Sequence, residues 1–430
     1  MNTGRKFNIW LIAAAIAIFA LNWGHVNQQG TFREVLLPAA QNIIDGEGYT
    51  HVWFDDAQAT YPLWGYSLML IPDAAAGADG LIALAVQLAM AVIAVNLVYR
   101  MFGVRERLWH IPLWLPWLAF MSVRWPDAPA AFFIIAYIYY HLKYIDSEKM
   151  KHMLAAGLML GLASNFRSDF LYLPGFVIVG ALVFDRRRIQ QHFVQTIAAY
   201  AVMLFLLAPW AIGSKAYTDD FRLTATNGGG VAYISLGQLP GNAWGIAARD
   251  ETAIKFARSR GIDNPYSARG DSLLKHEFFE SIKSSPVEYA KKIAYNLFSI
   301  AKGGVYTGEY AGLAIGFDRR YEINHEISGA PGIGGKIGAM LDLPAGESVP
   351  LAIEKLIQAI FVPIFLGALA IFMWLIFTKQ LSPPLRAVAA AAVVYKILLA
   401  AALLYEYRMM NPVYPLLIGA SLWWIARRRE

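Results

Sequence analysis

Apolar residues gather in long blocks along this chain, and short polar turns separate most of the blocks. Continuous apolar blocks, without the spacing of a half-buried helix or strand, are typical of helices that cross a membrane. The sequence therefore predicts an all-α polytopic membrane protein with about ten transmembrane helices. We expect the spans at residues 7–23, 81–99, 111–122, 130–142, 153–166, 170–184, 193–212, 353–377, 387–404 and 412–426.

Two polar sections interrupt these blocks and divide the chain. The first, residues 25–72, contains apolar residues at helical spacing from Thr31 to Asp45, which predicts a helix lying on the membrane surface. The segment from Tyr61 to Pro72 is too short to span a bilayer and is predicted to be re-entrant or juxtamembrane. The second section, residues 213–350, predicts a mainly helical periplasmic region with one helix near Pro286 to Ile300. The expected domains are an N-terminal transmembrane module at 1–212, the periplasmic region at 213–350 and C-terminal transmembrane helices at 351–430.

The distribution of basic residues predicts how these spans are oriented in the membrane. Of the 430 residues, 57% are hydrophobic and only 16% are charged, which excludes an ordinary soluble domain. Arginine and lysine cluster at alternate turns, as at residues 186–188 and 427–429, which places these turns and both termini in the cytoplasm. No small-residue cleavage site follows the first span, so we expect this span to be retained. The net charge of +6 is thus explained by the topology of a multi-pass membrane protein and need not indicate nucleic-acid binding.

Several arginines lie on the opposite side, where the topology does not explain them. Charges held at membrane depth are costly, and a guanidinium can bind a phosphate through two hydrogen bonds. A local ion pair would explain any one of these arginines, for example Arg167 with Asp169 or Arg408 with Glu406. As a set, however, they indicate a phosphate site on the outer face. The set is Arg33, Arg124, Arg167, Arg222 and Arg408.

The first outer loop carries the candidate acids. Asp55 and Asp56 stand between an aromatic pair and Tyr61, where a carboxylate could take a hydroxyl proton or bind a divalent cation with its neighbour. Glu34, early in the predicted surface helix, could do the same. Solvation of a loop explains Asp55 or Asp56 equally well, and attraction to a helix N-terminus explains Glu34. The residues themselves leave these alternatives open.

Other kinds of chemistry find little support in the sequence. The chain has no cysteine, which excludes disulfides, thiolate catalysis and cysteine-bound metal. Its 8 histidines show no metal-ligand spacing. The glycines after Asn227, beginning with Gly228, could bring backbone N–H groups to a phosphate or sugar, although a flexible hinge explains them too.

Five segments together resemble the GT-C superfamily of glycosyltransferases, which includes the aminoarabinose lipid A transferases and the protein O-mannosyltransferases. Their order and spacing cover most of the chain. The first loop departs from the family, because the acidic pair common at the start of its helix would fall on Phe32 and Arg33. The segments are AAQNIIDGEGY with TYPLWGYSLML (39–70), AAGLMLGLASNFRSDFLYLP (155–174), APW with TATNGGG (208–230), SSPVEYAKK (284–292) and YEYRMMNPVYPLL (405–417).

The resemblance implies a GT-C fold and an enzyme that moves a sugar from a polyprenyl-phosphate carrier to an acceptor hydroxyl on the outer face. In such a transfer a carboxylate is the general base, the anomeric centre inverts, and arginine balances the charge of the leaving phosphate. The expected partners are the lipid-linked donor, a glycan, lipid or protein acceptor, and membrane lipids. Because the donor brings its own phosphate leaving group, no cofactor is required, and a divalent cation (Mg²⁺ or Mn²⁺) is optional.

The resemblance also assigns roles to residues. The base is expected at Asp55 or Asp56, with Glu34 as the second choice, and an optional metal would bind the same aspartate pair. The donor phosphate is expected to contact Arg167, Arg408 and Arg124. Substrate contacts are expected from Tyr61, Tyr66, Asn227, Gly228 and Tyr407.

Two other functions stay open at this level. A secondary transporter or lipid-linked saccharide flippase would show internal repeats and polar residues at mid-membrane, whereas the polar residues here lie mainly in outer loops. A non-catalytic assembly subunit would tolerate the loss of every candidate acid. The sequence also leaves the sugar open among hexose, aminoarabinose and arabinofuranose.

Overall fold

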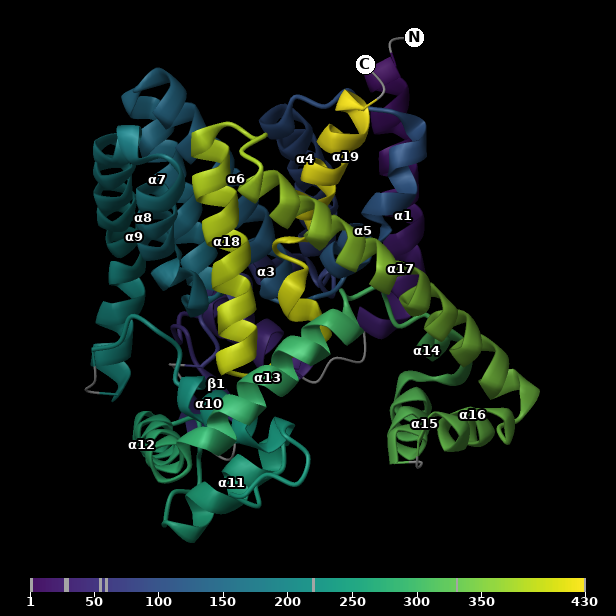
Figure 1. The fold of residues 1–430 in the computed structure, drawn as a ribbon. Helices are drawn as coiled ribbons and strands as arrows, with labels where there is room; N and C mark the ends of the chain where they lie inside the picture. Colours follow the sequence, from purple (N-terminus) through teal and green to yellow (C-terminus); the bar gives the residue numbers. More distant parts are fainter. Residues whose placement is uncertain are drawn as a thin grey trace.

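The apolar blocks fold into a bundle of helices (Figure 1). The structure is a computed structural model that describes the chain except residues 1–2, 27–30, 54–55, 59–60, 219–220, 330–331 and 429–430. In the described part, five helices are long and apolar enough to cross a membrane. They are α1 (Thr3–Val26), α4 (Leu81–Phe102), α9 (Ile189–Thr218), α17 (Ala345–Phe377) and α18 (Pro383–Ala402).

The other predicted spans correspond to helices that are shorter or less apolar. Two of them begin with a tighter 3₁₀ turn: η2 (Leu108–Trp114) leads into α5 (Leu115–Met121), and η3 (Ser168–Tyr172) leads into α8 (Leu173–Phe184). A further 3₁₀ turn, η4 (Arg186–Arg188), precedes α9. The remaining three helices are α6 (Asp127–Ser147), α7 (Met150–Phe166) and α19 (Tyr414–Arg427). The chain is therefore an all-α polytopic membrane protein.

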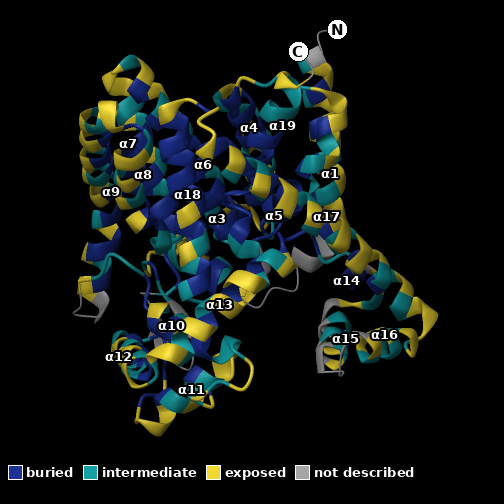
Figure 2. Ribbon diagram, in the orientation of Figure 1, coloured by how far each residue is buried: buried dark blue, intermediate teal, exposed yellow. Residues whose placement is uncertain are grey.

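Small residues let these helices approach closely. Gly157 and Gly161, four residues apart on α7, face α9, where a Cβ on Gly161 would stand 2.5 Å from Leu206. On α8, a Cβ at Gly180 would lie 2.3 Å from the carbonyl oxygen of Ala387 on α18. Van der Waals contact at such positions is a main source of helix association in lipid, where the hydrophobic effect no longer favours association. Buried residues accordingly fill the centre of the bundle, while α9 exposes apolar side chains (Figure 2).

The first outer loop folds back onto the bundle. Residues Thr31–Leu36 form a wide helical turn (η1) that continues into α2 (Leu37–Ile44), and two short antiparallel strands follow, β1 (His51–Trp53) and β2 (Asp56–Gln58). The predicted juxtamembrane segment is α3 (Gly65–Ala76), which packs against α2 and α4. Gly65 is needed there, because a Cβ would lie 2.5 Å from the carbonyl oxygen of Asn165 at the end of α7.

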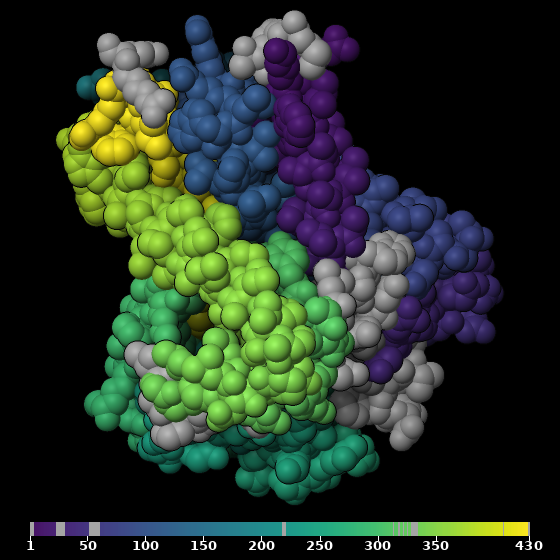
Figure 3. Space-filling view, turned by 90° about the vertical axis from the view of Figure 1, so that its right-hand side faces the viewer, coloured from purple at the N-terminus to yellow at the C-terminus, as the bar shows by residue number. Residues whose placement is uncertain are grey.

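The long polar section is helical, as predicted. Its first group of helices consists of α10 (Gly228–Ser235), the 3₁₀ turn η5 (Leu236–Gln238), α11 (Asp250–Ser259), α12 (Ala268–Ser284) and α13 (Pro286–Gly303). The second consists of α14 (Ala311–Ile315), α15 (Phe317–Gly329) and α16 (Gly332–Leu341). The second group stands beside the bundle at the start of the long helix α17 (Figures 1 and 3).

Glu354 of α17 attaches this second group to the bundle, because its buried carboxylate accepts hydrogen bonds from Arg320 Nη2 at 2.6 Å and from Ala311 N at 3.0 Å.

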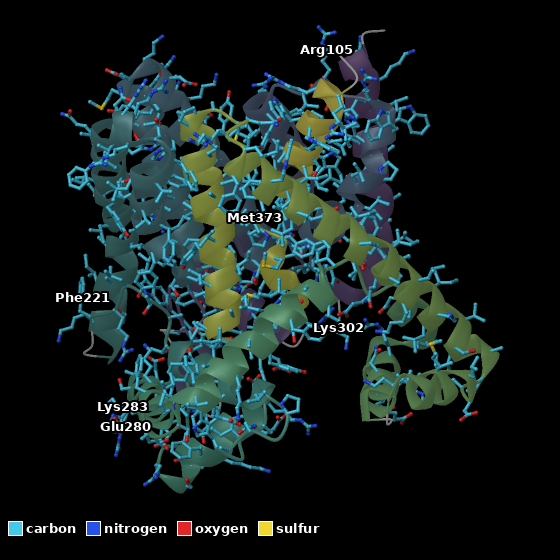
Figure 4. All side chains as sticks on the ribbon, viewed as in Figure 1. Arg105, Phe221, Glu280, Lys283, Lys302 and Met373 are labelled. Atoms are coloured by element: carbon cyan, nitrogen blue, oxygen red, sulfur yellow. The ribbon has the colours of Figure 1, made fainter. Side chains whose placement is uncertain are left out.

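The two ends of the molecule differ in character. Helix α1 begins and α19 ends at the same end, whereas α10 to α13 lie at the other (Figure 1). Arg105 points from the end that holds the termini, and Glu280 and Lys283 lie at the opposite end, on α12 (Figure 4). The structure thus shows a helical bundle with one end covered by α10 to α13, the helices that the sequence predicts to be extramembrane.

Substitution of Gly180 tests the packing of α8 on α18. We expect Gly180→Ala to destabilise the protein by about 1–3 kcal/mol, because the added methyl group must push the α18 backbone away. The matched control is Gly175→Ala on the same helix, where no atom lies within 4 Å of the new Cβ, and a Gly-to-Ala change in a helix is otherwise favourable. Thermal unfolding in detergent is the measurement. An unchanged or higher melting temperature for Gly180→Ala would contradict the packing described here.

Candidate functional site: a cationic cavity at the outer end of the bundle

A cavity of about 800 Å³ lies where the bundle meets the extramembrane helices. Its walls come from the first outer loop, the α5–α6 turn, the α7–α8 turn, α10, α12 and the end of α18 with the turn that follows it. Three of these segments, the α5–α6 turn, the α7–α8 turn and the end of α18, belong to the ends of bundle helices, so packing within the bundle positions them. Among the described residues, five cationic side chains line the cavity together with two carboxylates: Arg124, Arg167, Lys275, Lys396 and Arg408, with Asp127 and Asp169.

Arg167 is fixed between the two carboxylates. It follows the last residue of α7 with extended backbone, φ −146°, which turns its side chain towards the starts of α6 and η3. Its Nη1 pairs with Asp127, and its Nε donates to Asp169 Oδ1 at 3.0 Å. Within the described residues, Nη2 takes part in no hydrogen bond, and the side chain is 23% exposed. The guanidinium is therefore held in place while one of its nitrogens remains available to a ligand.

Lys396 shares one of these carboxylates from the far end of the sequence. Its Nζ lies 3.0 Å from Asp169 Oδ2 and 5.1 Å from the centre of the Phe170 ring, and its side chain is 3% exposed. The neighbouring Tyr395 hydroxyl donates to the Asp169 carbonyl oxygen. Asp169 thus joins α18 to the α7–α8 turn and orders two cations on one wall of the cavity.

Arg124 and Arg408 complete the cationic side. Arg124 precedes α6 and is almost fully buried, 4.3 Å from the Phe32 ring centre and 3.9 Å from Asp79. Burial lowers its pKa from the usual value, although Asp79 opposes the effect. Arg408 belongs to the 3₁₀ turn η6 (Tyr407–Met410), where its Nε lies 2.5 Å from Glu406 and its guanidinium stacks 4.5 Å from the Trp125 ring centre.

The extramembrane wall is aromatic and ordered by one buried carboxylate. Tyr61 stacks on Tyr266, with ring centres 4.9 Å apart, and burial raises the pKa of Tyr61 to about 12. Asn227 and Gly228 line the cavity at the start of α10. Asp271 holds this start in place, because it accepts hydrogen bonds from Gly229 N at 2.7 Å and from Lys275 Nζ at 2.7 Å.

This geometry can be compared with known proteins. Residues 74–212 match the model of the dolichyl-phosphate-mannose-protein mannosyltransferase family. No curated protein matches the chain. The matched segment runs from α3 to α9 and includes four of the charged residues at the cavity, namely Arg124, Asp127, Arg167 and Asp169. The resemblance to GT-C glycosyltransferases inferred from the sequence is thereby confirmed. The match supports a membrane glycosyltransferase that takes its sugar from a polyprenyl-phosphate carrier.

The structure brings together most of the predicted binding residues. Arg124, Arg167 and Arg408, predicted to bind the donor phosphate, line the same cavity, as do Tyr61, Asn227 and Gly228. The local ion pairs of Arg167 with Asp169 and of Arg408 with Glu406 are also present. These arginines therefore form local ion pairs and line the same cavity. The other two outer arginines stand elsewhere: Arg33 pairs with Asp79 at 3.3 Å, and Arg222 with Asp271 at 2.9 Å.

Other predicted residues lie apart from the cavity or outside the described residues. Tyr66 is fully buried and donates a hydrogen bond to Gln87 at 2.6 Å, so it supports α3 and does not face a substrate, contrary to expectation. Glu34 is exposed on η1 and does not line the cavity, although Thr31 and Leu36 of the same turn do. Asp55 falls outside the described residues, and only the backbone of Asp56 and Tyr407 is described. The described part of the chain contains no cluster of three acids or histidines that could hold a metal ion, and the optional metal at Asp55 and Asp56 stays a prediction.

Sequence reasoning missed four charged residues of the cavity: Asp127, Asp169, Lys275 and Lys396. For Lys396 a signal was available, because a lone lysine inside the apolar block at 387–404 is costly in a membrane unless it is paired. In the sequence, Asp169 stood out only as a local partner of Arg167, and Asp127 only as a residue of a short turn. Nothing in the sequence linked Lys275 to these turns.

Removal of the Asp169 charge tests the network. We expect Asp169→Asn to cost roughly 3 kcal/mol of stability, because Lys396 is then buried without its carboxylate. The control is Asp146→Asn, which breaks an exposed pair with Arg188 at 3.8 Å and should change stability by less than about 1 kcal/mol. The measurement is thermal or denaturant unfolding of both purified variants. Equal stability of the two variants would show that Asp169 does not hold the cations as described.

Proposed function

We propose that the cavity transfers one sugar from a polyprenyl-phosphate donor to an acceptor hydroxyl on the outer face of the membrane. The observation that carries the proposal is the convergence of Arg124, Arg167 and Arg408 from three separate turns on one cavity. Lys396 adds a fourth cation from within a membrane helix. The family match to residues 74–212 supplies the donor class.

The charge of the cavity suits a phosphate that leaves during the reaction. Negative charge builds up on the phosphate as the bond to the anomeric carbon breaks, and cations that are already oriented stabilise this charge without rearrangement. Arg167 is ordered by two carboxylates and Arg408 by Glu406 and Trp125. Lys396 shares Asp169 with Arg167, and each of the other cationic side chains also pairs with a carboxylate, so the cavity offers the ligand oriented cations rather than an excess of positive charge. We assign the donor phosphate to this side of the cavity.

The surroundings of the cavity suit a donor that remains in the lipid. Tyr172 at the start of α8 and Phe279 of α12 line the cavity and are also 63% and 57% exposed. Leu399 and Leu404 continue the apolar lining near the end of α18. The cavity therefore reaches the outer surface between apolar side chains, which suits a polyprenyl chain that stays in the bilayer while its head group enters.

The general base is assigned to the first outer loop. Asp127 and Asp169 face the cavity, but both are engaged by Arg167, so their role is to position the cation. We retain Asp55 or Asp56 as the base of an inverting transfer, with Glu34 second, because the loop that carries them borders the cavity through Thr31, Leu36 and Tyr61. An acceptor hydroxyl would then lie between this loop and the aromatic wall.

Turnover tests the reaction. Purified protein should release free polyprenyl phosphate from a matching polyprenyl-phosphate sugar only when an acceptor is added. Asp55→Asn, Asp56→Asn and Glu34→Gln separate the candidate bases, because loss of the true base should lower kcat by about 100-fold or more. Retained activity in all three variants would remove the base assignment. Movement of an intact donor across vesicles without cleavage would favour the flippase instead.

Loss of a cavity arginine tests the phosphate site. Arg167→Ala and Arg408→Ala should each weaken binding of polyprenyl phosphate about 10-fold or more, since each removes a charge-assisted hydrogen bond. Arg319→Ala is the matched control, because this arginine of α15 pairs with Glu347 at 3.0 Å and does not line the cavity. Binding is measured with the folded variants in detergent. Unchanged affinity in both cavity variants would exclude this assignment.

A further inference from the structure

The C-terminal end of α18 requires hydrogen-bond donors from elsewhere. A helix leaves its last four carbonyl groups without partners inside the helix, and they carry the negative end of the helix dipole. In α18 these are the carbonyls of Ala400, Ala401, Ala402 and Leu403. This end lines the cavity and is buried against the extramembrane helices, so water does not offer an easy substitute.

One face of α13 supplies the donors. Lys292 Nζ donates to Ala402 O at 2.8 Å, to Ala401 O at 3.3 Å and to Leu403 O. Asn296 Nδ2 reaches the carbonyls of Ala400, Ala401 and Leu403 at 3.2, 3.2 and 3.1 Å, and the Tyr289 hydroxyl donates to Ala402 O at 2.8 Å. Residues 289, 292 and 296 share one helix face because their spacing is three and then four. Thus α13 crosses the end of α18 and caps all four carbonyls (Figure 1).

The same contacts fix the chain that continues to Arg408. Gln238 accepts hydrogen bonds from Asn296 Nδ2 at 2.9 Å and from Tyr405 N at 2.8 Å, and donates to Tyr405 O at 2.7 Å. Arg408 comes three residues later, stacked on Trp125 at the cavity. Asn411 closes the segment, since its Oδ1 accepts from Tyr306 N at 2.8 Å. The segment 403–411 is therefore held at both ends, and α13 holds the first.

Lys292 is the exceptional member of this cap. Its side chain is fully buried, and among the described residues it forms no ion pair; its Nζ contacts carbonyl oxygens and the Tyr289 ring. Burial lowers the pKa of Lys292 to about 7, because desolvation disfavours the charged form, and the cap described here belongs to the protonated side chain. Its three N–H donors match the three carbonyls, a pattern that no neutral side chain of similar length reproduces.

We propose that Lys292 is a positioning residue that sets Arg408 at the donor site by capping α18 and ordering segment 403–411. The inference rests on the proposed function, because that proposal makes Arg408 a ligand of the donor phosphate. The contacts of Lys292 with α18 do not depend on it. Lys292 does not line the cavity, so any effect on the donor must pass through the segment that carries Arg408. The extramembrane helices thus take part in shaping the donor site and do not merely cover it.

The test compares Lys292→Met with Lys291→Met. Methionine keeps the length of lysine without donors, and Lys291 is the matched control because it precedes Lys292 on α13, is 65% exposed and pairs with Glu288. Two quantities are measured: amide hydrogen exchange of residues 403–411 in the ligand-free protein, and the dissociation constant of polyprenyl phosphate. We expect at least 10-fold faster exchange and about 10-fold weaker binding for Lys292→Met, and a lower kcat for the sugar donor, because Arg408 also stabilises the charge on the leaving phosphate. Lys291→Met should match the wild type.

A double-variant comparison shows whether the effect passes through Arg408. In an Arg408→Ala background, Lys292→Met should weaken polyprenyl phosphate binding little further, because the residue it positions is gone. Lys292→Arg, which restores a cation with several donors, should recover part of the affinity. Unchanged exchange of residues 403–411, or full additivity of the two substitutions, would overturn the proposal.

Two outcomes separate this inference from the proposed function. If the wild-type protein neither binds polyprenyl phosphate nor turns over any donor, the proposed function fails, and the exchange experiment alone decides whether Lys292 orders the Arg408 segment. If Lys292→Met fails to fold, Asn296→Leu removes the neighbouring donor of the same cap and should raise exchange in the same segment. No change there would count against the cap.

Discussion

The structure of the bundle end that α10 to α13 cover depends on Asp169, whose carboxylate pairs with both Arg167 and Lys396. This carboxylate holds Arg167 from the end of α7 and Lys396 from within α18, while Asp127 at the start of α6 holds the other side of Arg167. Three helices of the bundle are therefore joined by charge at the end of the bundle that α10 to α13 cover. These charges would be costly to bury without partners. Because they are paired, they hold the helix ends in fixed positions around the cavity. A cavity with ordered cations is the consequence.

Small residues make this arrangement possible. Gly157 and Gly161 bring α7 against α9, and Gly180 brings α8 against the backbone of α18. Close packing sets the height and rotation of each helix, and thereby the position of the turn at its end. The charged residues that the bundle contributes stand in or beside these turns, except Lys396, which lies within α18. Their mutual distances are thus determined by packing deeper in the bundle, several turns away from the cavity.

The extramembrane helices add a second constraint from outside. Helix α13 caps α18 through Tyr289, Lys292 and Asn296, and α10 is held to α12 through Asp271. Both contacts place polar residues where helix ends would otherwise leave backbone groups without partners. The cavity consequently lies between two layers of different origin: the helical bundle, and a helical layer that α13 attaches to it by hydrogen bonds to the end of α18.

The sequence alone determined the membrane character, the positions of the helices, the helix that begins at Pro286 and the set of outer arginines, because hydrophobicity and charge at span ends are local properties. It also led to the family, through segments that a match to residues 74–212 confirms in part of the chain. Only the tertiary structure decided which charges meet. Lys396 pairs with Asp169, which lies 227 residues away in the sequence, and Lys292 donates to Ala402, which lies 110 residues away. Tyr66 was misplaced for the same reason: the pattern showed a helix but not its rotation about its axis, which depends on the packing of all its neighbours.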